Sequence, residues 1–297
     1  MAELTFERLR DAVAGEAVAL RSRITLQPAG GPGDKVFPPT YAVNSGLKYA
    51  TEERRIGDTV SQTVLLDSVA SQANRAELAL LEGWDMGELS FPVPYVDFTV
   101  EEEVADLGQL TALEAPHRLA DAIFRDSLLE DTLFRLHDVG RAITNAHPRN
   151  ATDLYRYSPT GLLFGMWDST GPKGGLGSKF QRAYVSEIVG LDAQFGRKVS
   201  SRLDPLQIER EAAQRQIFVH EDAEQVWTLE ESDSDKKNNK AVIKGSGRPA
   251  EINHGNIAPS IDADAGGVTI SKAIQTTVVL MAISEIPQSW SANFPTL

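Results

Sequence analysis

Apolar residues recur at helical spacing between residues 64 and 82. Successive members of the series are four, four, three and four positions apart, which places them on one face of an α-helix. The series consists of Leu65, Val69, Ala73, Ala76 and Leu80. The pattern therefore predicts a helix over 64–82 that buries one side and exposes the other.

Weaker patterns predict the remaining elements. Alternating or continuous apolar runs are typical of strands, and apolar residues three or four apart are typical of helices. We expect strands over 22–27, 161–167 and 183–191, and helices over 6–20, 116–130, 206–216 and 271–283. Because helices and short strands are interleaved, the pattern indicates an α+β fold.

The chain shows no internal repeat and no sharp linker, so we expect a single domain over 1–297 with insertions. The range 28–60 begins with a loop rich in glycine and proline, and the range 82–110 begins with a strongly acidic stretch. We expect both ranges to be insertions. The range 229–250 has few apolar residues and is expected to be a mobile loop.

Composition and charge narrow the class of protein. The apolar fraction is 41% and the charged fraction 24%, which is typical of a soluble domain with a core. The net charge is −13, which disfavours a uniformly basic surface and still allows one basic groove. The chain has no cysteine, which excludes disulfides, thiolate nucleophiles and iron–sulfur clusters. With no signal peptide or membrane span, we expect a cytoplasmic protein.

No motif of catalysis stands out. The five histidines form no H-E-x-x-H pair, and G-x-S-x-G, G-x-G-x-x-G and the P-loop pattern are absent. We therefore expect no metal, no cofactor and no enzymatic activity.

Two features favour a binding function instead. The helix over 64–82 carries Ser71, Gln72, Asn74 and Arg75 outside its apolar stripe or at its edge. Their hydroxyl, amide and guanidinium donors are suited to a sugar–phosphate backbone or to unpaired bases. A solvated helix face is the competing interpretation.

The second feature is an uneven placement of charge. Six basic residues and only two acidic ones lie in 171–203, and Lys173 and Lys179 flank a run of glycines. Backbone amides of a glycine-rich loop approach phosphates closely, and lysines add charge. An ordinary loop with solvated lysines would look the same.

Several segments, in order, resemble one CRISPR protein family. The resemblance spans about 20–285 and is carried by L-L-D-S-V-A-S-Q-A-N-R (65–75), G-G-P-G-D-K-V-F-P-P-T-Y (30–41), H-R-L-A-D-A-I-F-R-D-S (117–127), L-L-F-G-M-W-D-S (162–169), S-E-I-V-G-L-D-A (186–193), H-G-N-I-A-P (254–259) and G-G-V-T (266–269). These segments resemble the Cas-seven type backbone subunit of the type I-G (formerly I-U) Cascade complex.

The resemblance implies a modified RRM, a ferredoxin-like core with large insertions. It implies copies stacked head-to-tail along one guide RNA (crRNA), with a hairpin "thumb" between bases and target DNA read by base pairing. The other implied partners are Cas-five/Cas-six-like and large Cas-eight-like Cascade subunits, with no membrane and no catalysis. We also expect the acidic stretch 82–106 to meet a basic patch on the neighbouring copy.

Candidate RNA contacts follow from this comparison. The family's motif helix assigns Ser71, Gln72, Asn74 and Arg75 to the guide RNA. A second group is chosen for charge and loop setting: Lys35, Arg118, Lys173, Lys179, Arg182, Arg197 and Lys198.

Two other functions stay open at this point. One is an RNA-processing endoribonuclease of the same superfamily, which would use His117 or His254. By analogy with related backbone subunits that cut target RNA with an acidic residue, Asp34 or Asp168 would serve for that cleavage. The other is a scaffold that assembles without RNA.

Overall fold

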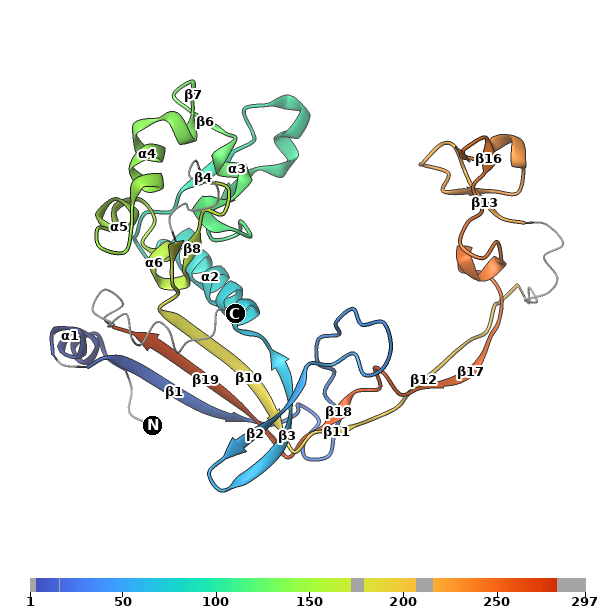
Figure 1. Ribbon diagram of the computed structural model, residues 1–297, viewed down its shortest axis with the longest axis horizontal. Coiled ribbons are helices and arrows are strands. Elements are labelled where there is room, and N and C mark those ends of the chain that lie inside the picture. Colours follow the sequence, from blue (N-terminus) through green and yellow to red (C-terminus); the bar gives the residue numbers. More distant parts are fainter. Residues whose placement is uncertain (1–3, 16, 172–178, 207–215, 282–297) are drawn as a thin grey trace. The chain divides into compact units, whose positions relative to one another are not determined.

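The computed structural model describes residues 4–15, 17–171, 179–206 and 216–281, and the chain forms two compact units (Figure 1). The sheet unit comprises 1–34, 50–193 and 270–297. The ribbon unit comprises 35–49 and 194–269. Four chain crossings therefore join the two units.

A five-stranded antiparallel sheet is the centre of the sheet unit. Its order is β1-β19-β10-β3-β2. The strands are β1 (Ala19–Leu26), β2 (Thr51–Ile56), β3 (Thr59–Asp67), β10 (Tyr184–Leu191) and β19 (Lys272–Leu280). The strands expected over 22–27 and 183–191 are thus confirmed with small shifts. The helix expected over 271–283 is wrong, because this segment pairs with β1 on one side and β10 on the other.

The main helix, α2 (Val69–Asp85), starts later than predicted. Residues 64–67 belong to β3, and Ser68 caps the helix by accepting a hydrogen bond from the Ser71 backbone N–H. The buried positions of α2 are Gln72, Ala73, Glu77 and Leu81. The buried side of the helix is therefore partly polar, which the apolar stripe did not predict.

The central strands of the sheet pack against α2 and against one another. On one face α2 packs against β10 (Figure 1). Val189, Leu191 and Ile274 form a small apolar cluster with Ile56 and Leu65. The register pairs Val189 with both Leu65 and Ile274, so this cluster crosses the three central strands.

Short elements fill the segment between α2 and β10. They are β4 (Tyr95–Asp97), η1 (Glu102–Leu107), β5 (Gln109–Thr111), η2 (Arg118–Ala120), α3 (Ala122–Arg125), β6 (Leu128–Leu129), β7 (Thr132–Leu133), η3 (Phe134–Leu136), α4 (Asp138–Asn145), α5 (Thr152–Tyr157), α6 (Thr160–Phe164), β8 (Met166–Trp167) and β9 (Lys179–Phe180). A core that includes Leu119, Phe124, Ile143, Leu154 and Phe180 holds them together.

Three further predictions need correction. The helix expected over 116–130 is two short helical turns, η2 and α3, followed by strand β6. The strand expected over 161–167 is mostly helix α6, with only its last two residues in β8. The helix expected over 6–20 is α1 (Phe6–Ala14), which ends before Gly15 and gives way to β1.

The ribbon unit is built from short antiparallel pairs. They are β11 (Gln194–Phe195) with β18 (Val268–Thr269), β12 (Lys198–Arg202) with β17 (Ile257–Asp262), β13 (Phe218–Val219) with β14 (Trp227–Thr228), and β15 (Lys236–Lys237) with β16 (Lys240–Ala241); η4 (Glu231–Asp233) and η5 (Pro249–Ile252) complete it. Most of the helix expected over 206–216 lies outside the described residues.

The α+β class is confirmed by this architecture. Of the expected insertion 28–60, residues 51–56 form β2 and so belong to the main sheet. The range 229–250 contains η4, β15 and β16. Among the described helices, none has the length and apolar character needed to cross a membrane.

Candidate nucleic-acid interface

A buried carboxylate organises the first turns of α2. Asp67, the last residue of β3, accepts hydrogen bonds from Gln72 Nε2 at 2.6 Å and Arg75 Nε at 2.8 Å. Burial alone would raise the pKa of Asp67, but hydrogen bonds from Ser71, Gln72 and Arg75 hold it below its ordinary value. Asp67 is therefore an anionic anchor for the motif helix.

Gln72 lies between the helix and the sheet. Its side-chain oxygen accepts hydrogen bonds from Ser186 Oγ at 3.0 Å and Gln275 Nε2 at 2.8 Å. Ser186 Oγ in turn lies 2.8 Å from Thr277 Oγ1. Gln72 is buried and links α2 to β10 and β19, so its amide is engaged inside the protein.

The other three motif residues lie nearer the solvent. Asn74 is exposed and Ser71 is half-buried. The Arg75 side chain is 70% exposed although its Nε binds Asp67. Ser71 and Arg75 are four residues apart and therefore share a helix face. This exposed turn offers a hydroxyl, an amide and a guanidinium that is held at one end.

Arg118 is committed to a buried ion pair. Its guanidinium donates to both oxygens of Glu77, with Nη2 at 2.9 Å, and to the carbonyl of Gly165 at 3.3 Å. It also lies 5.7 Å from the ring centre of Phe164. Burial raises the pKa of Glu77, while Arg118 and Arg182 oppose that rise. The guanidinium of Arg118 thus joins α2 to the following segment through the ion pair with Glu77.

The cations around the glycine-rich run differ in setting. Lys179 and Arg182 are exposed. The Lys179 ammonium lies 4.9 Å from the ring centre of Trp167, on the neighbouring strand of the β8–β9 pair. Lys173 lies outside the described residues.

Three candidates belong to the ribbon unit. Lys35 Nζ donates to the carbonyls of Arg197 at 3.1 Å and Gly266 at 3.0 Å. Lys35 therefore joins the 35–49 segment to the chain just before β12 and just before β18, which is a structural role. The side chains of Arg197 and Lys198 are exposed.

The β12–β17 ribbon presents a feature that sequence reasoning missed. Val199 pairs with Ile261 across the strands, and the two are 72% and 66% exposed. The next pair, Ser200 and Ser260, has its hydroxyl oxygens 3.1 Å apart. Since neighbouring positions of a strand point to opposite faces, the ribbon has an apolar face and a polar one. The only sequence signal was alternation over a few residues.

A polar network holds the far end of this ribbon. Asp204 accepts hydrogen bonds from the backbone N–H of Gly255 at 2.6 Å and of Leu206 at 3.0 Å. These bonds lower the pKa of Asp204. Arg202 donates to the carbonyls of His254 and Gly255. The backbone of His254 and Gly255 thus supplies the partners of Arg202 and Asp204. His254 Nδ1 also lies 3.9 Å from Asp204.

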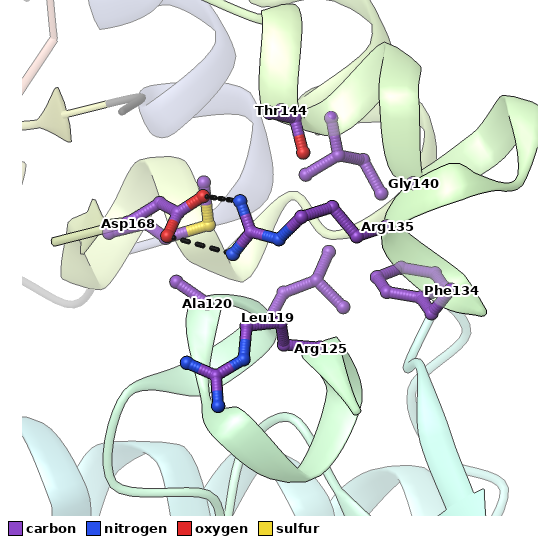
Figure 2. Close-up of a pocket in the computed structure, with 10 residues that line it drawn as sticks. Leu119, Ala120, Arg125, Phe134, Arg135, Gly140, Thr144 and Asp168 are labelled. Atoms are coloured by element: carbon purple, nitrogen blue, oxygen red, sulfur yellow. Dashed lines mark hydrogen bonds and ion pairs between the residues drawn. The ribbon is translucent and has the colours of Figure 1, made fainter. Parts of the chain in front are cut away.

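Two of the residues suspected of catalysis, Asp168 and His117, have partners within the sheet unit. Asp168 pairs with Arg135 through two hydrogen bonds of 2.7 and 3.1 Å (Figure 2). The His117 backbone N–H donates to Asp121. In the described part of the chain, no three metal-ligating side chains converge.

A small cavity lies beside the Arg135–Asp168 pair. Figure 2 shows Leu119, Ala120, Arg125 and Thr144 around it. The cavity has a volume of about 20 Å³. That is room for about one or two water molecules, not for an organic substrate.

The comparison with known proteins supplies the family. The sequence pattern of the family described as CRISPR-associated protein GSU0053 matches residues 20–195. The chain belongs to this family. None of the curated proteins matches the chain. The match covers α2, the five-stranded sheet except β19, and the whole segment between α2 and β10. The exposed turn of α2 is therefore part of the pattern that defines this CRISPR-associated family, whereas the β12–β17 ribbon lies beyond it.

Proposed function

We propose that this CRISPR-associated protein is a guide-RNA-binding backbone subunit of a type I-G Cascade complex. The single observation that carries the proposal is the β12–β17 ribbon. It exposes a cross-strand apolar pair, Val199 and Ile261, next in sequence to the exposed cations Arg197 and Lys198, of which Lys198 lies opposite Asp262. Apolar side chains inserted between stacked bases, with cations on the phosphates, are a recurring way to bind and kink nucleic acids.

The ribbon fits the thumb expected of such subunits. A two-stranded ribbon is thin, and its register is set by β12–β17 pairing and by the network at Asp204. Burying the exposed valine and isoleucine side chains between bases removes apolar surface from water, which lowers the free energy of the complex. In this account Val199 and Ile261 form the wedge, and Arg197 and Lys198 bind phosphates.

The sheet unit supplies a second contact area. The turn of α2 that carries Ser71, Asn74 and Arg75 offers donors with little net charge, which suits a sugar–phosphate backbone. The antiparallel sheet with α2 on one face agrees with a modified RRM core. The buried Gln72 holds this turn of α2 to the sheet through its hydrogen bonds with Ser186 and Gln275.

Repeated copies on one RNA require contacts between subunits. Head-to-tail contacts between unlike patches generate open helical assemblies. Stretch 82–106 contains eight acidic residues and no basic one, and we propose that it faces the positive surface of the adjacent copy. The Cas-five/Cas-six-like and Cas-eight-like subunits would close the ends.

The test is the nucleic-acid content of the purified protein. The full chain is purified with a co-expressed guide RNA, and its absorbance ratio and hydrodynamic size are measured before and after ribonuclease. We expect an RNA-rich assembly that ribonuclease reduces to small species. A monomer that ignores RNA would contradict the proposal, and a large RNA-free assembly would favour the scaffold. Shortening of an added repeat RNA would favour the endoribonuclease.

A further inference from the structure

An exposed tryptophan stands on the β8–β9 hairpin of the sheet unit. Met166 and Phe180 form the inward pair of this hairpin and are buried. Trp167 and Lys179 form the adjacent pair, and Trp167 is 52% exposed. A half-exposed indole leaves a large apolar ring in water. The packing of the sheet unit does not account for this position.

The ring is already paired with a cation. Lys179 Nζ lies 4.9 Å from the ring centre of Trp167, within the range of a cation–π interaction. An ammonium placed on an indole holds the ring and puts a positive charge beside it. This arrangement differs from a typical protein-binding patch, in which lysine is depleted.

We propose that Trp167, together with Lys179, is a stacking platform for one unpaired base of the bound RNA. The indole would stack on the base, and the ammonium would bind a neighbouring phosphate. The proposal rests on the proposed RNA-binding function and adds a ligand contact to it. Stacking of bases on aromatic side chains is largely independent of sequence, as a subunit that carries many different guides requires.

The backbone on both sides of Trp167 is fixed. Asp168 is buried and held by Arg135 through two hydrogen bonds. Gly165 has a φ of +83°, and a Cβ there would lie 3.0 Å from the backbone nitrogen of Arg182. Only glycine adopts this conformation in this space without strain. A ring on a rigid support loses little conformational entropy on binding, which favours tight stacking.

The charges around the ring favour a polyanion. Lys179 and Arg182 are exposed. Asp168, the next residue after Trp167, is paired with Arg135, and Asp126 is paired with Arg125. A paired acid repels a phosphate less than a free one, so the exposed Lys179 ammonium beside the ring favours a phosphate there.

The test measures RNA binding by tryptophan fluorescence and by direct titration. The chain has four tryptophans, and the full protein is titrated with an unstructured oligouridylate. We expect RNA to quench the wild-type emission. W167F should lose most of this quenching and keep most of the affinity, because phenylalanine still stacks. W167A should weaken binding about fivefold to 150-fold, from the usual range for one stacked base.

Two matched variants serve as controls. W227A removes another partly exposed tryptophan, from the ribbon unit, and should leave affinity unchanged. K179M should lower the salt dependence of binding by about 0.7 on the log–log scale, as one lost phosphate contact does for single strands. Circular dichroism verifies that each variant is folded.

The outcomes separate the two proposals. If W167A binds the oligouridylate within about twofold of the wild type while the wild type binds well, the stacking platform is wrong and the RNA-binding function stands. A wild-type protein that binds no RNA at all overturns the proposed function and the platform with it. If W167A keeps RNA affinity and loses binding to another Cascade subunit, Trp167 is a protein contact and the platform is wrong.

Discussion

Individual side chains on α2 and around it separate into two roles. Gln72 and Arg118 are engaged inside the protein, one with Ser186 and Gln275 and the other with Glu77. Arg75 keeps most of its guanidinium in solvent while Asp67 holds its Nε. A cation that is positioned by one bond and otherwise exposed is well suited to a phosphate.

Arg75→Ala is expected to weaken RNA binding without unfolding the protein. The Arg75 side chain is 70% exposed, so its loss leaves no cavity, and one phosphate contact disappears. The log–log salt slope should fall by about 0.7. The measurement is a titration with oligouridylate at several salt concentrations. Arg55→Ala, at an exposed position on β2, is the matched control and should change neither quantity. Equal loss in both variants would mean a general charge effect.

The sequence indicated the candidate residues of α2 but not which of them face the protein interior and which face the solvent. Helical geometry places Gln72 at the edge of the apolar stripe, and only the tertiary partners Ser186 and Gln275, far away in the chain, decide that it is buried. Likewise, nothing local to Arg118 indicates Glu77 as its partner. Trp167 received no role because a short apolar run does not reveal which of its residues faces outward.

At the scale of elements, the Glu77–Arg118 pair fastens α2 to the segment that follows it. Both side chains are largely buried. Removing one partner leaves an uncompensated buried charge, which typically costs about 3–5 kcal/mol. The pair therefore matters for stability whether or not RNA is present.

Arg118→Met is expected to lower the free energy of unfolding by about 3 kcal/mol or more at neutral pH. Burial raises the pKa of Glu77 in the folded protein, and loss of Arg118 removes an opposing influence. The folded state then binds a proton more tightly than the unfolded state, so stability falls as pH rises through the folded pKa. The deficit should shrink as the pH is lowered through the ordinary glutamate pKa of about 4.3, below which Glu77 becomes protonated in both states.

Urea denaturation at two pH values checks this prediction. The double variant Glu77→Leu with Arg118→Met replaces both charges by apolar side chains and should recover part of the loss. A deficit that is the same at both pH values, or a double variant no more stable than the single one, would contradict the account.

The ribbon offers an element-scale test of the proposed wedge. Val199→Ser with Ile261→Ser changes two exposed side chains, so stability should change by about 1 kcal/mol at most. Affinity for oligouridylate should nevertheless drop, because the apolar pair no longer enters the base stack. Ser200→Ala with Ser260→Ala alters the opposite face and should leave affinity unchanged. Thermal melts measure stability, and binding titrations measure affinity. If Ser200→Ala with Ser260→Ala weakens binding more than Val199→Ser with Ile261→Ser, the wedge is refuted.

Element prediction failed where distant pairing overrides local pattern. In 271–283 the apolar residues fit a helical period, yet the β-branched run over 276–279 favours a strand. Partners in β1 and β10 decide for the strand. The strand over 183–191 was predictable because its apolar run is bounded and rich in β-branched residues. In 116–130 the turns η2 and α3 are too short for periodicity to reveal.

At the scale of the whole molecule, an acidic chain contains local cationic surfaces. The net charge is −13, yet Arg197 and Lys198 at the start of β12, Lys179 beside Trp167, and Arg182 are exposed. In the proposed function, such a distribution would let RNA bind at these surfaces while acidic stretches contact other subunits. The net charge allows a basic groove on this chain but does not predict where such surfaces lie.

The most direct test of the central claim is the stoichiometry of assembly on RNAs of increasing length. The full chain is mixed with unstructured oligouridylates, and the mass of each complex is measured by light scattering or native mass spectrometry. The account predicts that each fixed increment of RNA length adds one copy of the chain, and that ribonuclease releases them. One chain per RNA at every length, or equal assembly without RNA, would contradict it.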